Sequence, residues 1–503
     1  MDDFTLHIDP SNNRQKKTIG KILRKFLLVE KFSGWWGFAI FFIISSILAY
    51  AIAESGMKIA LMVIAFSVAL PVVYFLVVKP EFGIMVYLTL AYTIMWFLRY
   101  GVGGFPLGTL MDGMLALFTL GMFMQIKQKQ DFDLLKGKVS LMILIWVSYT
   151  MMQVANPAAE SRLAWVYTVR TVGLVTLMYF IFTYNIRTKQ FIRIILKWWI
   201  VWSFINACYA FKQEYFGFAD FEEQWLHSAP ELASLLFLAG HWRKFSMFSD
   251  PVTFAYNMAT ASLLCMALIT GPLQTYKKMI LGFLAVFFLY VMLFSGTRGA
   301  FPLVPAAFML YAILKFNRQI LVFTVGALFF IVFLIFMPTS NQNILRFQTA
   351  FRPNNDASYK VREMNQARIK PYIYTHPIGG GLGATGEWGI KFAPNSFLAH
   401  FPPDSGYVRT TVELGWIGLF IFSYMIFTIL KTGVNSYYDI RDPELKSYSL
   451  GMILMVFTWN IGNFPQQALV QYPSNVLFFL AVALMGVIYR IDQQQNLAIN
   501  GKL

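Results

Sequence analysis

The chain has 503 residues, of which 57% are apolar, 17% aromatic and only 13% charged, and its mean hydropathy is +0.56. A helical membrane span needs about 20 apolar residues, so this composition accommodates about a dozen spans. These values exclude a soluble enzyme, a secreted disulfide scaffold, a disordered chain and a β-barrel, and they predict an all-α polytopic membrane protein.

The net charge of +16 arises from 41 Lys and Arg residues against 25 Asp and Glu residues. The basic residues gather in short segments between apolar runs, which is how cytoplasmic loops of membrane proteins are marked. The charge therefore does not indicate a nucleic-acid partner. The cysteines, Cys208 and Cys265, both lie within apolar runs and cannot form a disulfide framework.

Apolar runs bounded by charge, Pro or Gly predict about 12–14 transmembrane helices. The candidate spans cover residues 35–52, 58–78, 83–98, 106–124, 139–154, 163–184, 192–211, 252–270, 279–295, 301–315, 319–337, 409–430, 447–462 and 473–489. The weakest candidates are 139–154 and 301–315, because they are short. With the N-terminus inside, basic connections alternate with weakly charged ones, so we expect both termini in the cytoplasm.

These spans divide the chain into tails, helices and one large loop. Residues 1–34 are expected to form a basic cytoplasmic tail rather than a cleaved signal peptide, although their apolar and basic mixture also suits a helix on the membrane surface. A transmembrane domain at 35–337 is followed by a large periplasmic loop at 338–408. C-terminal transmembrane helices at 409–489 and a second cytoplasmic tail at 490–503 complete the chain.

Two outer connections are long, and long loops in compact folds are usually functional. The first covers residues 212–251. Its apolar stretch Leu232–Ala239 is too short to span and is expected to form a re-entrant or interfacial helix. The second covers residues 338–408, and the spacing of apolar residues over Ser358–Tyr374 predicts an amphipathic helix on the outer surface.

Several basic residues fall on the outer side of the membrane, against the usual distribution of charge. Arg243 and Lys244 end the first long loop, and Arg298 lies in a tight turn between two spans. Arg170 lies inside a span, where a charge is costly and tends to have a specific partner. Guanidinium groups bind phosphate oxygens bidentately, so this basic face suits a lipid pyrophosphate. The second long loop adds Arg346, Arg352, Lys360, Arg362, Arg368, Lys370 and Lys391.

Each of these residues also has a simpler interpretation. A lone Arg at a helix end, such as Arg243 or Arg298, commonly extends to the lipid headgroups. A structural ion pair explains Arg170 equally well, and the basic residues of the second loop suit the solvated face of a surface helix. Only their combination favours a binding site.

The segment Phe401–Arg409 leads directly into the span at 409–430 and contains Asp404. Its Pro-Pro-Asp-Ser-Gly sequence is typical of a turn. Alternatively, the carboxylate deprotonates an acceptor hydroxyl, as carboxylates do for water in inverting glycosidases. The upstream run His376–Gly383 is dense in glycine, which would let the backbone approach a phosphate or sugar. It lacks the lysine and the strand-to-helix context of a nucleotide-binding loop.

We expect no metal site and no cofactor. The histidines beyond the N-terminal tail lie in outer loops, and none has the spacing of a metal ligand with another His or Cys. Asp131-Phe132-Asp133 has the form of a metal-dependent glycosyltransferase signature. It lies in a lysine-rich cytoplasmic loop, however, and is interpreted as a cluster of solvated charges.

The order of these motifs resembles the O-antigen ligase and polymerase superfamily, which transfers glycans from undecaprenyl pyrophosphate on the periplasmic face. As in that family, Arg243 precedes a helix start that contains Pro251, and Arg298 lies in a Ser-Arg-Gly-like turn, here Gly296–Gly299. The long loop then carries His376–Gly383, which matches the family's His-Pro-(small)-Gly-x-Gly segment. The resemblance covers roughly residues 240–430.

The family's closing pattern is a His, then Asn, Ser or Gln, nine residues, a Gly, two residues, and then Gly, Thr or Tyr. Here it reads Asp404, Ser405, nine residues, Gly415 and Gly418, so the spacing is intact and the leading His is an Asp. In the ligases this His is the proposed base. The resemblance therefore implies that Asp404, or the nearby His400, takes that role.

The resemblance implies a multi-span fold of the GT-C type, a metal-free mechanism and direct displacement with inversion at the anomeric carbon. Arg243 and Arg298 would hold the pyrophosphate and offset the charge of the leaving group, while Asp404 would orient or deprotonate the acceptor hydroxyl. The first spans would form a slot for the polyprenyl tail. Further substrate contacts are implied for Arg170, Arg362, Arg409, His376, His400 and Lys244.

The function implied is that of a bacterial inner-membrane glycosyltransferase with its active site facing the periplasm. A polymerase is favoured because the ligase His is missing, and the alternative is a ligase acting on lipid A-core or on a protein hydroxyl. The expected partners are an undecaprenyl-pyrophosphate-linked glycan, a glycan, lipid A-core or protein acceptor, the lipid bilayer and a regulator of chain length.

Two other classes remain as alternatives. A transporter or lipid flippase also fits many spans and the intramembrane Arg170, but transporters usually contain internal repeats, and none is visible by inspection. A membrane assembly scaffold would not need several outward arginines beside tight turns.

Overall fold

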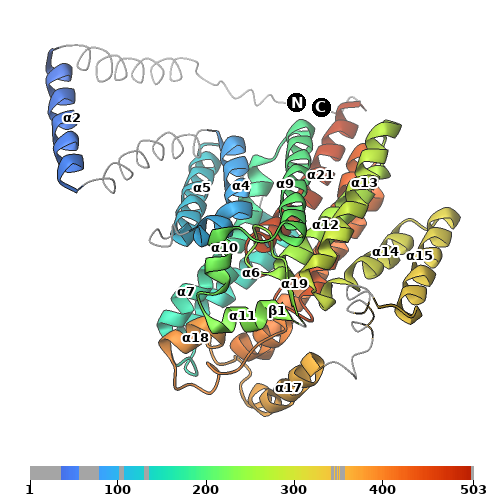
Figure 1. The fold of residues 1–503 in the computed structure, drawn as a ribbon. Helices are drawn as coiled ribbons and strands as arrows, with labels where there is room; N and C mark the ends of the chain where they lie inside the picture. The colour runs from blue at the N-terminus through green and yellow to red at the C-terminus, as the bar shows by residue number, and fades with distance from the viewer. Residues whose placement is uncertain are drawn as a thin grey trace, which may run out of the picture. The chain divides into compact units, whose positions relative to one another are not determined.

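The computed structural model describes residues 35–55, 79–100, 107–129, 135–238, 240–340 and 357–499, together with Leu345, Gln348 and Phe351. Within these residues the chain is helical apart from turns, connections and one two-stranded hairpin (Figure 1). Nine helical segments of this described part are long and apolar enough to cross a membrane. The prediction of an all-α polytopic membrane protein is confirmed.

The chain forms two compact units, residues 1–74 and residues 75–503. In the first unit, α2 (Trp35–Ser55) occupies a predicted span, whereas the predicted tail at 1–34 and span at 58–78 lie outside the described residues. In the second unit, predicted spans are occupied by α4 (Pro80–Arg99), α5 (Leu107–Lys129), α6 (Lys138–Met152), α9 (Lys189–Tyr215), α12 (Pro251–Ile269), α13 (Thr275–Met292), α14 (Leu303–Leu314), α15 (Arg318–Phe336), α19 (Gly406–Asp439), α20 (Pro443–Gly462) and α21 (Ser474–Ile499).

Side-chain caps begin several of these helices. Asp250 accepts hydrogen bonds from the amides of Val252 and Thr253 at the start of α12. Asp442 and Ser405 cap α20 and α19 in the same way. Such caps satisfy amide groups that have no partner within the helix, so each helix starts where a carboxylate or hydroxyl residue precedes an apolar run.

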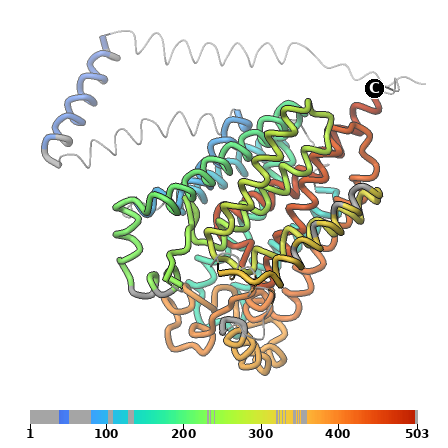
Figure 2. The backbone as a smooth tube through the Cα atoms, turned by 45° about the vertical axis from the view of Figure 1, so that its right-hand side comes forward, coloured from blue at the N-terminus to red at the C-terminus, as the bar shows by residue number. Residues whose placement is uncertain are grey.

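The centre of the second unit is formed by α12 and α21. In each of these helices, 83% of the apolar window is buried. α12 packs against α13 and α20, and α20 packs against α21, so the long helices run side by side (Figures 1 and 2). A helix that is apolar on all sides is stable only when other helices surround it, which is why these two lie inside.

Two predicted spans are interrupted. The span at 163–184 consists of α7 (Arg162–Val172), the 3₁₀ turn η4 (Leu174–Leu177) and α8 (Met178–Asn185). α19 is broken at Gly415, whose φ of 70° and ψ of −170° are not helical. Backbone groups freed by such breaks need partners within the protein. The segment His376–Gly383 supplies them on both sides of Gly415, because it bonds the carbonyls of Val412 and Glu413 and the amide of Ile417.

The first outer connection contains α10 (Asp220–Leu226), α11 (Pro230–Leu236) and a hairpin of β1 (Phe237–Leu238) and β2 (His241–Trp242). The structure corrects the interpretation of Leu232–Ala239 as one re-entrant or interfacial helix. Leu238 pairs with His241 across the hairpin, so this end of the stretch satisfies its backbone by strand pairing.

The second outer connection contains α17 (Ala357–Thr375) and α18 (Gly386–Phe392). α17 confirms the helix predicted over Ser358–Tyr374, but its buried face differs from the expected apolar stripe. Val361 and Met364 are 50% and 68% exposed, whereas Ile369 is 1% exposed. Ile369 packs in a small core with Phe401, so α17 is anchored near the turn that precedes α19.

Candidate functional site

A polar groove lies at the end of the second unit where α12 and α19 begin. Its volume is about 620 Å³ when the open solvent at its mouth is included. The lining side chains are Asp250, Val252, Thr253, Tyr256, Pro403, Asp404, Gln466, Gln467, Ala468 and Gln471. These described residues include two carboxylates and three amides, but no Lys or Arg. They come from the start of α12, the turn before α19 and the connection between α20 and α21.

The start of α12 holds Asp250 in place. One carboxylate oxygen caps the helix, and the other accepts hydrogen bonds from Ser249 Oγ at 2.7 Å and Thr253 Oγ1 at 2.8 Å. Both hydroxyl oxygens also lie 2.7 Å from Gln471 Oε1. Gln471 therefore joins the α20–α21 connection to the start of α12.

Arg298 lies in a tight turn that Arg243 holds. The turn joins the 3₁₀ segments η5 (Leu293–Ser295) and η6 (Arg298–Ala300). Arg243 Nε donates to the Ser295 carbonyl at 2.9 Å, and its Nη2 lies 3.1 Å from Thr297 Oγ1. The structure thus brings together the two segments that carry the predicted arginines, and Arg243 positions the turn on which Arg298 is found.

This turn packs against the start of α12. The Thr297 hydroxyl donates to the carbonyl of the first α12 residue at 3.2 Å. A Cβ atom at Gly299 would lie 3.2 Å from the Tyr256 hydroxyl and from the Pro465 ring. Because Tyr256 lines the polar groove, the turn that carries Arg298 adjoins the groove wall.

Asp404 lines the groove and faces Arg362 of α17. Arg362 Nε and Asp404 Oδ2 are 3.6 Å apart, and the two side chains are 32% and 41% exposed. This separation is longer than a hydrogen bond. The pair is therefore a loose one, and the carboxylate stays accessible to a hydroxyl group in the groove.

Arg409, in the first turns of α19, supports the segment that carries Asp404 and is more buried than Asp404. Its Nε donates to Glu413 Oε1 at 3.0 Å and its Nη1 donates to Gln467 Oε1 at 2.7 Å. Gln467 in turn donates to the carbonyl of Pro403, the residue before Asp404. Arg409 is 15% exposed and Glu413 2% exposed, so this buried ion pair supports the backbone that carries Asp404.

The glycine-rich run is packed into the protein. The amides of Gly380 and Gly381 donate to carbonyls of α19, and the Gly383 amide donates to the Glu413 carboxylate at 3.0 Å. A Cβ atom at Gly379, where φ is 76°, would lie 2.5 Å from the Glu413 backbone. These amides are used within the fold, so the run stabilises the break in α19. This corrects the interpretation of the run as a cradle for phosphate or sugar.

His376 and His400 are held by local contacts. The His376 ring stacks on Tyr372 with centroids 3.9 Å apart, and its Nδ1 lies 3.0 Å from the Tyr372 carbonyl. His400 is exposed, and its Nε2 lies 2.7 Å from the Pro394 carbonyl. Neither histidine is among the described residues that line the polar groove, whereas Asp404 is.

Lys244 points into the core of the first outer connection. It is 5% exposed, its Nζ lies 3.5 Å from Glu214 Oε2, and it lies 4.9 Å from the centre of the Phe218 ring. Burial lowers the pKa of Lys244, and the Glu214 carboxylate partly counteracts this effect. These contacts indicate that Lys244 stabilises the connection.

Arg170 pairs with Asp112 of α5. Its Nη1 lies 2.9 Å from Asp112 Oδ2, and the side chains are 27% and 31% exposed. This is the specific partner expected for a charge within a span, and it matches the structural interpretation of Arg170. The predicted loop residues Arg346 and Arg352 lie outside the described part of the chain.

Sequence reasoning missed Arg99, at the end of α4. It is 8% exposed, its Nη1 donates to the Ser246 carbonyl at 3.0 Å, and its guanidinium stacks on Phe245 at 4.2 Å. It anchors the segment that leads to Asp250. An Arg at the end of a span is an ordinary interfacial pattern, so no signal marked it.

The glutamines of the α20–α21 connection were also missed. Gln466, Gln467 and Gln471 all line the groove. Three amides within a short outer connection were a visible signal in the sequence, but they lie beyond the part of the chain that carries the recognised motifs.

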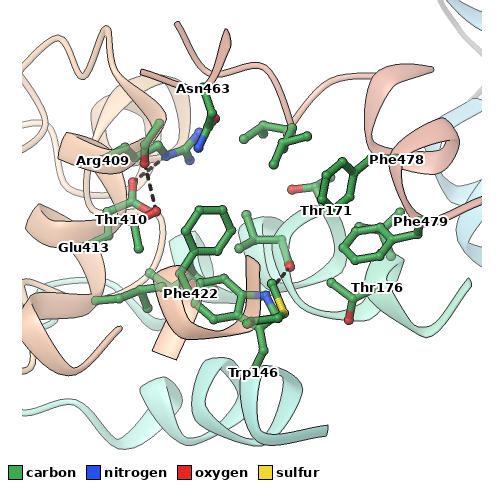
Figure 3. Close-up of a pocket in the computed structure, with 18 residues that line it drawn as sticks. Trp146, Thr171, Thr176, Arg409, Thr410, Glu413, Phe422, Asn463, Phe478 and Phe479 are labelled. Carbon is green, nitrogen blue, oxygen red and sulfur yellow. Dashed lines mark hydrogen bonds and ion pairs between the residues drawn. The ribbon is translucent and has the colours of Figure 1, made fainter. Parts of the chain in front are cut away.

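An apolar pocket lies on the other side of this connection (Figure 3). Its volume is about 630 Å³, including open solvent. Leu469 and Val470 line it, together with aromatic residues such as Phe422 and Phe478. Arg409 and its partner glutamate lie at one side in Figure 3. The α20–α21 connection therefore separates a polar groove from an apolar pocket.

No cluster of three or more His, Cys, Asp or Glu side chains suited to a metal ion occurs in the described part of the chain. Asp131-Phe132-Asp133 lies outside it.

Residues 283–423 match the family model of O-antigen ligase. The matched segment contains the Arg298 turn, α17, the glycine-rich run and Asp404, and the segment of Arg243 precedes it. The resemblance to the O-antigen ligase superfamily is thereby confirmed. No match was found among curated proteins.

Proposed function

We propose that this chain, whose residues 283–423 match the family model of O-antigen ligase, is a glycosyltransferase that takes its glycan from undecaprenyl pyrophosphate. The acceptor is a hydroxyl group, and the reaction occurs on the periplasmic face of the bacterial inner membrane. Both chain ends lie in the cytoplasm in this proposal. Between the branches of the superfamily we favour a polysaccharide polymerase.

One observation carries the proposal: a carboxylate and a loosely paired arginine face each other at a polar groove. Asp404 lines the groove and lies 3.6 Å from Arg362. The turn of Arg298 adjoins the same groove through its contact with Tyr256. A base for a hydroxyl and cations for a pyrophosphate are the two requirements of glycan transfer from a lipid pyrophosphate.

The proposed reaction is an in-line displacement. The acceptor oxygen attacks the anomeric carbon as the bond from that carbon to the pyrophosphate oxygen breaks, which inverts the anomeric centre. The hydroxyl proton passes to Asp404. Arg298 and Arg362 offset the negative charge that develops on the leaving undecaprenyl pyrophosphate. Arg243 acts by holding the Arg298 turn.

The apolar pocket supports the use of a lipid-linked donor. It is lined by Phe422, Phe478 and other apolar side chains and adjoins Arg409, so an isoprenoid chain there would lie below the arginine end of the site. Burial of isoprene units in such a pocket stabilises binding by the hydrophobic effect, at about 0.8 kcal/mol per buried methylene-sized group. The sequence predicts a slot for the polyprenyl tail in the first spans. This pocket, by contrast, is lined by residues of later helices such as α19 and α21.

The decisive experiment uses the full-length protein in detergent with a synthetic undecaprenyl-pyrophosphate oligosaccharide and no other acceptor. A ladder of longer lipid-linked products would establish the polymerase. A donor that stays unchanged until lipid A-core or a hydroxylated peptide is added would establish a ligase instead. Binding of the lipid without turnover on any acceptor would contradict a glycosyltransferase and favour a transporter.

A further inference from the structure

The α20–α21 connection presents its polar side to the groove and its apolar side to the pocket. Gln466, Gln467 and Gln471 face the groove, while Leu469 and Val470 face the pocket. These residues lie beyond the family match, which ends at 423. The connection can therefore contact a ligand in the groove or in the pocket, although it lies outside the segment that matches the family.

Not all of these glutamines are engaged in holding the fold. Gln467 bridges Arg409 and Pro403, and the Gln471 carbonyl oxygen accepts from Ser249 and Thr253. The Gln466 side chain, by contrast, makes no side-chain hydrogen bond to the described residues and is half-buried at the groove. A polar side chain that lines a groove without a protein partner is suited to bind a ligand.

The chemistry of the groove matches an uncharged sugar. A primary amide offers both donors and an acceptor, as do sugar hydroxyl groups. Both oxygens of Asp250 already accept hydrogen bonds within the protein, so Asp250 contributes its negative charge to the groove. The described lining contains two carboxylates and no Lys or Arg. Arg362 faces Asp404 at 3.6 Å, so the like charge that a carboxylated or phosphorylated sugar would meet is that of Asp250, which lowers affinity by several-fold even when solvent screens it.

We propose that Gln466 and the side-chain amide nitrogen of Gln471, beside the negative charge of Asp250, form the subsite for the acceptor's terminal sugar, and that this sugar is uncharged. This inference rests on the proposed function, because Asp404 in the same groove is the base that takes the acceptor proton. The sugar bound beside Asp404 is then the acceptor, while the donor pyrophosphate lies towards Arg298 and Arg362.

The test measures binding of free sugars, which requires no turnover. The full-length protein in detergent is titrated with matched pairs of methyl glycosides and their uronides, namely methyl glucoside with methyl glucuronide and methyl galactoside with methyl galacturonide. Methyl N-acetylglucosaminide and methyl rhamnoside are added as further neutral probes. Saturation-transfer NMR reports binding of each.

We expect at least one neutral glycoside to bind, and its uronide counterpart to bind about tenfold more weakly. Gln466→Ala should weaken the neutral glycoside by about tenfold, the value of one or two hydrogen bonds. Gln466→Lys should strengthen binding of the uronide. Gln494→Ala, an exposed glutamine near the far end of α21, serves as the control and should change nothing.

Three results would overturn the subsite: no binding of any neutral glycoside, equal binding of the uronide, or unchanged binding in Gln466→Ala. A kinetic measurement separates this failure from failure of the proposed function. With the lipid-linked donor, Gln466→Ala should raise the KM for the acceptor about tenfold and leave kcat within about twofold. Glycoside binding that Gln466→Ala weakens, without any donor turnover, would contradict the proposed function and leave only a binding site for a neutral sugar.

Discussion

The second unit has tightly paired charges at the end where α9 and α20 begin, and a loosely paired carboxylate at its groove end. At the end where α9 and α20 begin, Lys189 Nζ lies 2.5 Å from Asp442 and 3.0 Å from Glu444. Arg193 donates to both oxygens of Glu444 at 2.6 Å. At the groove end, Asp404 lies 3.6 Å from its arginine and is 41% exposed.

Tightly paired charges stabilise the fold, and loosely paired ones are available for ligands. Two charged groups at hydrogen-bond distance neutralise each other and use their donors and acceptors on each other. A loose pair beside a groove keeps donors and acceptors that a ligand can use. Burial would raise the pKa of Asp442, but hydrogen bonds from Lys189 and from backbone amides outweigh it and hold that pKa below its usual value.

Arg298→Ala should lower glycan transfer by about 100- to 1,000-fold, because in the proposed reaction this arginine offsets the charge of the leaving group. Expression and the elution profile in detergent should be normal. The measurement is product formation from the lipid-linked donor at saturating acceptor. A fully active variant would remove the pyrophosphate role of Arg298.

Asp404→Asn should lower kcat by about 100-fold or more, since the amide cannot take the acceptor proton. His400→Ala should cost much less, because His400 is exposed and bonded to a loop carbonyl outside the groove. The two variants are compared in one assay at several pH values. The reverse ranking would assign the base to His400.

Glu413→Ala should destabilise the protein by about 3–5 kcal/mol, because it leaves the Arg409 charge buried without its partner. It would also remove the acceptor of the Gly383 amide. The measurement is thermal unfolding in detergent. Leu at both positions 409 and 413 is the control, since it removes both charges together and should restore part of the stability. An unchanged melting temperature in Glu413→Ala would contradict the supporting role of the pair.

Arg193→Ala should cost less than about 1 kcal/mol and leave transfer unchanged, because Arg193 is 45% exposed and water screens its ion pair. Lys189 still neutralises Glu444 in this variant. Melting temperature and initial rate are measured together. A loss of activity as large as that of Arg298→Ala would show that the two ends do not differ in the way described.

Treatment with EDTA should leave the rate unchanged, which is the smallest effect in this series. The proposed chemistry uses arginines to offset the charge on the pyrophosphate. The assay is run with and without chelator at the same ionic strength. Inactivation by EDTA that Mg²⁺ or Mn²⁺ reverses would contradict the metal-free mechanism.

The sequence predicted the helices better than the roles of the loops. Apolar runs predict helices correctly because a segment in lipid must hydrogen-bond its backbone polar groups within itself, whatever its neighbours are. The prediction that the glycine-rich run approaches a phosphate or sugar was wrong. A high glycine content indicates that the backbone approaches something closely, but it does not identify what. At Gly379 the backbone approaches α19 of the same chain. Lys244 and Arg170 show the same limit, since their partners Glu214 and Asp112 are distant in sequence.

The sequence alone determined the all-helical membrane fold, the segments that carry Arg243 and Arg298, and Asp404 at the closing motif. Local composition and spacing suffice for these features. Only the tertiary structure shows that Gln466 and Asp404 line the same groove. It also shows that the glycine-rich run donates hydrogen bonds to the backbone of α19. Which side chains share a groove depends on how distant helices pack, and packing is decided by complementary shapes that no single segment contains.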